Sequence, residues 1–174
     1  MQPIKTEVVF STAFFDVLAK TMKPGEAPYY SLRVPDFAVI VALTGDDRML
    51  AVRQYRPSVE RYTVELPSGL VDPGESPAQA AQRELLEETG YAAAEVEMLG
   101  PMNAEDGRLT NQLWTCFARG VRPVRNRVPE EGIEVIAYSM DDLAQATRNG
   151  EFCHAPHVGS VLLALLHGKL KLGS

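Results

Sequence analysis

Three glutamates in the short stretch RELLEETG are the residues of this sequence best placed to do chemistry. Glu84, Glu87 and Glu88 fall in the last turns of a predicted helix, where the helix dipole disfavours negative charge and neighbouring carboxylates repel by roughly 0.2–0.5 kcal/mol per pair. At about 100° per residue they share one face of that helix. A divalent cation such as Mg²⁺ or Mn²⁺ would neutralise all three, and carboxylate oxygens are ligands that such hard cations prefer.

A solvated acidic face is the alternative interpretation of these glutamates. Arg83 lies one turn from Glu87, so a pair between the two is expected. We expect this arginine to relieve at most one of the three acids, which leaves metal binding as the better explanation.

The helix that carries the glutamates has clear start and stop signals. Ser76 is suited to the N-cap, Pro77 to the first helical position, and Gln79 completes a capping box. Gly90 is suited to the left-handed C-terminal position. The sequence therefore predicts a helix from residue 77 to about residue 89.

A longer pattern surrounds this helix. Residues 69–91 read G-x5-E-x7-R-E-U-x-E-E-x-G-U, where U is a bulky apolar residue and the fixed positions are Gly69, Glu75, Arg83, Glu84, Leu85, Glu87, Glu88, Gly90 and Tyr91. The pattern resembles the Nudix box at every fixed position; the one soft deviation is Tyr91, where an aliphatic residue is usual.

The resemblance implies an α/β fold, a Nudix α/β/α sandwich with a mixed sheet, plus a small N-terminal β region. Residues 1–35 are then N-terminal strands for dimerisation, and residues 36–174 the hydrolase domain. In this family the N-terminal strands usually exchange between subunits, so a homodimer is expected. Arg33 is a candidate contact to a diphosphate or to the partner subunit.

The resemblance also implies a role for each box residue. It gives Glu84 and Glu88 as ligands of Mg²⁺ or Mn²⁺, Glu87 as a further ligand, and the Ser68 carbonyl as one more, with two or three ions per site when substrate is bound. Arg83 orients the glutamates, and Glu75 pairs with Arg83.

Outside the box, residues 52–75, VRQYRPSVERYTVELPSGLVDPGE, resemble the branch of ADP-ribose pyrophosphatases and nucleotide-sugar hydrolases. Arg56 matches the arginine that reaches the substrate pyrophosphate, and Glu65 matches the acid of the family's E-[LF]-P-[AS]-G segment. Arg56 ends a predicted strand, a suitable place for a bidentate phosphate contact. Arg53, expected to point the same way, is a weaker substrate-binding candidate.

In this branch the general base comes from a later acidic loop, which residues 128–139 provide. The resemblance places Glu131 at the base position and leaves Glu130 as its rival. Asp106 stands where enzymes that favour ADP-ribose often carry proline. This departure weakens the case for ADP-ribose as the particular substrate, but not the case for nucleotide sugars as a class. The loop of Asp106 is still expected to border the terminal sugar.

The expected function is Mg²⁺-dependent hydrolysis of the pyrophosphate bond of ADP-ribose or another nucleoside diphosphate sugar, giving a nucleoside monophosphate and a sugar phosphate. One alternative is hydrolysis of another nucleotide, such as a dinucleoside polyphosphate or an oxidised triphosphate. Another is a non-catalytic sensor of nucleotide sugars.

The elements that must position these residues interleave strands with helices. We expect strands over residues 6–19 and 29–34, a hairpin over 36–56, strands over 62–66, 112–120 and 133–139, a short helix capped by Ser139 that ends near residue 149, and a last helix at about 157–167. Hairpins dominate the connections, which favours a mixed sheet with helices on both faces.

Composition narrows the partners. The chain has 174 residues and a net charge of −6, which argues against binding to nucleic acid or to anionic membranes. Its apolar runs are too short to span a bilayer, and its two cysteines suit free thiols in a reducing compartment. We therefore expect a soluble, cytoplasmic protein. His154, His157 and His167 are interpreted as structural or surface residues.

Overall fold

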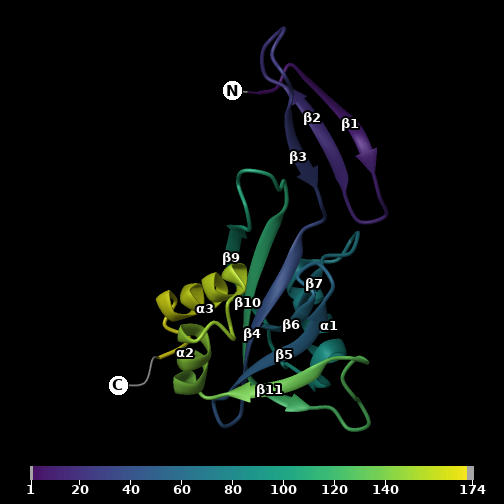
Figure 1. Ribbon diagram of the computed structural model, residues 1–174. Helices are drawn as coiled ribbons and strands as arrows, with labels where there is room; N and C mark the ends of the chain where they lie inside the picture. The colour runs from purple at the N-terminus through teal and green to yellow at the C-terminus, as the bar shows by residue number, and fades with distance from the viewer. Residues whose placement is uncertain (1, 172–174) are drawn as a thin grey trace.

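The computed structural model of the protein describes residues 2–171 as two sheets and three helices (Figure 1). The first sheet is antiparallel and three-stranded, in the order β1-β2-β3, with bounds Lys5–Ser11, Asp16–Thr21 and Tyr29–Arg33. It projects beyond one end of the main body (Figure 1). The predicted small N-terminal β region is therefore present.

The main sheet follows the order β11-β5-β4-β10-β8, and three further strands pair with members of this path: β6 with β5, β7 with β4 and β9 with β10. Strands β4 and β10 are parallel, whereas the other pairs are antiparallel, so the sheet is mixed as predicted. The strands are β4 (Phe37–Thr44), β5 (Met49–Arg56), β6 (Arg61–Glu65), β7 (Ser68–Leu70), β8 (Tyr91–Ala92), β9 (Glu97–Asn103), β10 (Gln112–Pro123) and β11 (Glu134–Tyr138).

Helices cover both faces of this sheet because successive residues of its central strand point to opposite sides. Ala38 and Ile40 of β4 pack with α1, and Val39 and Val41 pack with the other two helices. All four side chains are fully buried. The helices are α1 (Pro77–Thr89), α2 (Met140–Arg148) and α3 (Ala155–Leu166), which completes the predicted α/β/α sandwich.

The termini of α1 match the sequence prediction. The Ser76 hydroxyl accepts the Gln79 backbone N–H, the Gln79 side chain accepts the Ser76 backbone N–H at 2.8 Å, and Gly90 adopts φ 73°. These signals are local, and they fix where the three glutamates sit along the helix axis.

Several strand predictions need correction. Residues 6–19 form two strands, not one, because the Thr12 hydroxyl accepts the Phe14 and Phe15 backbone N–H groups and turns the chain. Strands β7, β8 and β9 were not predicted. In β9, Gly100 and Pro101 interrupt the pattern, but its one described partner is β10, and edge strands tolerate proline.

Within the described residues 2–171, none of the helices is long and apolar enough to cross a membrane.

Candidate active site

Arg83 lies at the centre of the acidic face of α1. Its Nη1 donates to Glu84 Oε1 at 2.6 Å and to Glu87 Oε2 at 3.1 Å, while Nε and Nη2 donate to the two Glu75 oxygens at 3.1 and 3.0 Å. The predicted pairs with Glu75 and Glu87 are confirmed. The expectation that Arg83 relieves at most one of the three α1 acids is wrong, because one Nη1 reaches both Glu84 and Glu87.

The absence of a side chain at Gly69 leaves room for the Glu84 carboxylate. Strand β7 passes so close to α1 that a Cβ added to Gly69 would collide with the Glu84 carboxylate. Burial raises the pKa of Glu84, and the hydrogen bond from Arg83 opposes that rise. The glycine of the box is therefore required by the approach of a carboxylate rather than by a left-handed backbone.

Glu88 is the least compensated of the three acids. Its side chain is only 5% exposed, and its Oε2 accepts the Ser68 backbone N–H at 2.9 Å. Burial is the main reason that the pKa of Glu88 rises to about 8, with Glu84 adding to the rise and Arg56 opposing it. Among the described residues, Glu88 forms no salt bridge with a cationic side chain, unlike Glu84 and Glu87, which pair with Arg83.

The donor set around Glu88 suits a hard divalent cation. Three carboxylates from α1 and the neighbouring Ser68 backbone offer oxygen ligands, and Arg83 supplies only one charge against several acids. Added cationic charge would lower the cost of ionising Glu88, so the residues fit the metal that the sequence pattern implies.

Arg56 and Glu65 form a bidentate pair next to this acidic face. Arg56 Nε and Nη2 donate to the two Glu65 oxygens at 2.8 and 2.6 Å, and the Thr63 hydroxyl donates to Glu65 Oε1 at 2.6 Å. Burial alone would raise the pKa of Glu65, but these hydrogen bonds outweigh it and hold it at about 2. Glu65 therefore stays ionised and fixes the guanidinium of Arg56.

Helix α3 supports the segment that joins Glu65 to Ser68. The backbone N–H of Leu66 donates to His157 Nδ1 at 3.0 Å, and His157 is only 1% exposed. Burial lowers the pKa of His157 to about 3, so its ring is neutral. The prediction of a structural role for His157 agrees with this contact.

Glu65, His154 and His157 each bring one potential ligand atom within 4.8 Å of the others, a spacing that suits a metal. The tautomer of His157 argues against such a use. Its Nδ1 lone pair accepts the Leu66 N–H, so the proton of the neutral ring lies on Nε2 and no free lone pair remains for a metal. The oxygen-rich face of α1 is the better metal site.

The acidic loop before β11 approaches the end of α1. The Glu130 backbone N–H donates to the Glu87 carbonyl at 3.0 Å, and the charge of Glu130 contributes to the raised pKa of Glu84. Glu131 lies beside it, exposed, in the turn that follows. Both base candidates are therefore near the glutamates, and the described contacts connect Glu130 to them.

Arg53 is turned away from Arg56. The two arginines are three positions apart on β5, so their side chains lie on opposite faces, and the expectation that they point the same way is wrong. Arg53 instead donates to Glu134 at 3.1 Å and stacks 4.4 Å from the centre of the Tyr62 ring.

Arg33 is the last residue of β3 in the N-terminal sheet, and Asp106 lies in the loop between β9 and β10, which packs on that sheet. Arg33 pairs with Asp16 through Nε at 3.0 Å and Nη2 at 2.6 Å. The loop of Asp106 is held to β3 because the Leu32 backbone N–H donates to the Arg108 carbonyl at 2.6 Å. Neither residue has a described contact to the acids of α1.

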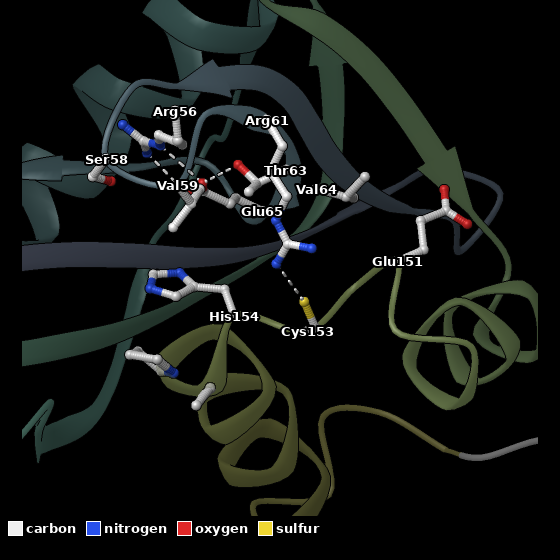
Figure 2. Close-up of a pocket in the computed structure, with 12 residues that line it drawn as sticks. Arg56, Ser58, Val59, Arg61, Thr63, Val64, Glu65, Glu151, Cys153 and His154 are labelled. Carbon is white, nitrogen blue, oxygen red and sulfur yellow. Dashed lines mark hydrogen bonds and ion pairs between the residues drawn. The ribbon is translucent and has the colours of Figure 1, made fainter.

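A cavity of about 450 Å³ lies between the β5–β6 hairpin and the start of α3, and we name it the hairpin–helix cavity (Figure 2). Its polar walls include Arg56, Ser58, Arg61, Glu65, Cys153 and His154. The sequence analysis missed Arg61. The signal was the segment RPSVER, in which a four-residue turn over residues 57–60 places Arg61 opposite Arg56 in the hairpin.

Comparisons with known proteins agree with the fold and with the box. A family model described as NUDIX domain matches residues 34–157. The chain is 27% identical over 174 residues to the methanol dehydrogenase activator of Bacillus methanolicus, which covers 97% of this chain and 94% of that protein. It is 26% identical over 154 residues to the ADP-ribose pyrophosphatase of Bacillus subtilis (strain 168), covering 85% of this chain and 83% of that protein.

Among solved structures, a crystal structure of an ADP compounds hydrolase matches with a TM-score of 0.80 and 23% identity, over 97% of this chain and 96% of that chain. This likeness extends the shared fold over the N-terminal sheet as well as the main sheet.

Replacing Gly69 by alanine tests the link between the close approach and the metal site. The new methyl group must displace the Glu84 carboxylate, whereas the backbone of Gly69 is not left-handed and tolerates alanine. We expect the affinity for Mn²⁺, measured by electron paramagnetic resonance, to fall roughly 10- to 100-fold. The free energy of unfolding should change by less than about 1 kcal/mol.

Gly45→Ala is the matched control, because a Cβ added there meets nothing within 4 Å. Unchanged Mn²⁺ affinity in Gly69→Ala would show that the position of Glu84 does not matter for the metal.

Proposed function

This chain belongs to the Nudix family, in the branch of the ADP-ribose pyrophosphatases, and on that premise we propose that it hydrolyses nucleoside diphosphate sugars with Mg²⁺ or Mn²⁺. The products are a nucleoside monophosphate and a sugar phosphate. The names of the Bacillus subtilis relative and of the matched structure, an ADP-ribose pyrophosphatase and an ADP compounds hydrolase, support this substrate class.

One observation carries the proposal. Glu88 is buried beside Glu84, accepts one backbone N–H from Ser68, and pairs with none of the cationic side chains among the described residues. A protein that only needed a stable helix would place an apolar residue there, since a buried, unpaired carboxylate costs free energy. A bound divalent cation removes that cost.

Each residue of the site has a defined task in this proposal. Glu84, Glu87, Glu88 and the Ser68 carbonyl hold the metal, which when bound neutralises phosphate oxygens and makes water more acidic. Arg83 keeps the glutamates oriented through its pairs with Glu84 and Glu87. These side chains position the pyrophosphate and the attacking water.

Arg56 binds the pyrophosphate. Two of its five N–H groups are used by Glu65, so the other three remain for phosphate oxygens. The ionised Glu65 keeps the guanidinium plane in one orientation, which lowers the entropy lost when substrate binds.

Glu130 is the better candidate for the general base. A base must lie within one hydrogen bond of the attacking water, and that water must lie beside the metal ligands. The Glu130 backbone bonds to the Glu87 carbonyl, and its charge acts on Glu84. Glu131 remains its rival from the next position of the turn.

The N-terminal sheet supports a homodimer. Strand β1 is exposed along its whole length; Phe10 of β1 is 58% exposed, and Phe14 of the turn that follows is 77% exposed. Monomeric proteins rarely expose so many apolar side chains together, so a second copy of this chain covers the sheet in our proposal. The exchange of strands between subunits stays a prediction.

A substrate panel tests the proposed function. With Mg²⁺, the protein should release a nucleoside monophosphate from at least one of ADP-ribose, GDP-mannose and UDP-glucose, detected by liquid chromatography. Glu88→Gln should reduce the rate by more than about 100-fold, because an amide cannot supply the anionic ligand.

Failure to release a monophosphate from every nucleotide sugar, with hydrolysis of diadenosine polyphosphates or oxidised triphosphates instead, would refute the proposed substrate class. Arg122→Gln, an exposed arginine of β10, serves as the control for handling and folding.

Glu130→Gln and Glu131→Gln identify the base, and each is the other's control. We expect Glu130→Gln to lower kcat by roughly 10²- to 10⁴-fold, the usual contribution of a general base, while Mn²⁺ affinity stays within a few-fold. Glu131→Gln should leave kcat within a few-fold. A large loss only in Glu131→Gln would reverse the assignment.

A further inference from the structure

Two arginines face each other across the β5–β6 hairpin. Arg56 and Arg61 are register partners at the ends of the two strands, and both line the hairpin–helix cavity. Like charges directly opposite each other in an antiparallel pair are destabilising. A negative charge bound beside them would relieve this repulsion.

The protein compensates only one of the two arginines. Glu65 takes the charge of Arg56 through two hydrogen bonds. Arg61 has one described polar contact, from Nη2 to Cys153 Sγ at 3.7 Å, and none of the carboxylates of residues 2–171 lies within 4.0 Å of it. Figure 2 shows its guanidinium pointing toward Cys153, inside the cavity.

The remaining acid of the cavity does not neutralise Arg61. Glu151 accepts a hydrogen bond from the Tyr138 hydroxyl at 2.8 Å. Figure 2 places it at the far end of the cavity from Arg56. The cavity is therefore lined by two arginines and two glutamates, and Arg61 is the arginine of this lining that has no described carboxylate partner.

The N-terminus of α3 adds positive potential to the hairpin–helix cavity. His154 occupies the N-cap without a side-chain hydrogen bond to the helix, and His154, Ala155 and Pro156 all line the cavity. Helix N-termini carry partial positive charge and favour anions. Partial desolvation lowers the pKa of His154, so the formal positive charge of the cavity comes from the arginines.

We propose that the hairpin–helix cavity is an anion subsite, which holds a carboxylate or phosphate carried by the sugar end of the substrate, with Arg61 as its main contact. This assignment rests on the proposed function. It extends that function from nucleotide sugars in general to those whose sugar bears an acidic group.

Position and size both favour the sugar end of a substrate over a free ion. Arg56 and its partner Glu65 both line the cavity, and Glu65 lies three positions before Ser68, whose backbone N–H bonds to Glu88. One molecule bound through its pyrophosphate at Arg56 therefore reaches the cavity directly. A volume of about 450 Å³ falls within the range of small-molecule sites and accommodates a sugar, whereas an inorganic phosphate would fill little of it. The Ser58 side chain offers a hydroxyl group to the sugar.

The test compares two sugar phosphates that differ by one acidic group and carry no base. Binding of glucuronic acid 1-phosphate and of glucose 1-phosphate is measured by isothermal titration calorimetry in the presence of Mg²⁺. We expect the glucuronate to bind about fivefold tighter or more, because it gains a charge-assisted hydrogen bond. Arg61→Gln should make the two affinities equal, and the control Arg122→Gln should preserve the preference.

Equal affinities in the unaltered protein, no measurable binding of either compound, or a preference that survives Arg61→Gln would each overturn the subsite. Inorganic phosphate is the third titrant: if it binds as tightly as the glucuronate and depends equally on Arg61, the cavity holds a free anion and the substrate assignment is wrong. The titrations require no turnover, so they fail or succeed separately from the hydrolysis of the nucleotide-sugar panel.

Discussion

The buried carboxylate of Glu88 is the constraint on which the rest of the site depends. It lies at the end of α1, beside Glu84, and a single backbone N–H from Ser68 is its described hydrogen-bond donor. The protein holds an ionisable group in this place against both desolvation and repulsion, and burial accordingly raises the pKa of Glu88 to about 8. The neighbouring elements can be understood as the supports that keep this arrangement intact. Gly69 admits the Glu84 carboxylate, Arg83 spans Glu84 and Glu87, and the capped start of α1 sets the position of all three acids.

A second set of contacts connects this acidic face to the opposite side of the sheet. His157 of α3 accepts the Leu66 backbone N–H, so the helix fixes a short segment whose two ends carry Glu65 and Ser68. Glu65 orients Arg56, and Ser68 contacts Glu88. The same helix start forms one wall of the hairpin–helix cavity. Helices on both faces of the sheet therefore contribute to one site, which is the functional consequence of the sandwich.

Local spacing was sufficient to predict the part of the site that lies on α1. The caps at Ser76 and Gly90, the shared face of the glutamates and the pairs of Arg83 with Glu75 and Glu87 all follow from positions a few residues apart. Contacts between distant residues were not predictable in the same way. His157 meets Leu66 across 91 positions of the chain, and only the fold brings them together.

Two arginines of the hairpin could have been placed from the sequence. Arg61 was missed although its register opposite Arg56 follows from the hairpin. Arg53 was assigned to the wrong face, although residues three positions apart on a strand point to opposite faces. Strand β9 escaped prediction because glycine and proline remove its pattern while the edge of the sheet still accepts it.

Metal-linked stability is the most direct test of the claim that the acidic face of α1 is complete only with a cation. The free energy of unfolding is measured for the protein and for Glu88→Gln, each with and without excess Mg²⁺ or Mn²⁺. Without metal, the variant should be at least as stable as the protein, because the amide removes a buried acidic group. Metal at 100 times its Kd should stabilise the protein by about 2.7 kcal/mol and the variant by much less. Equal stabilisation of both, or a metal-free variant that is clearly less stable, would contradict the account.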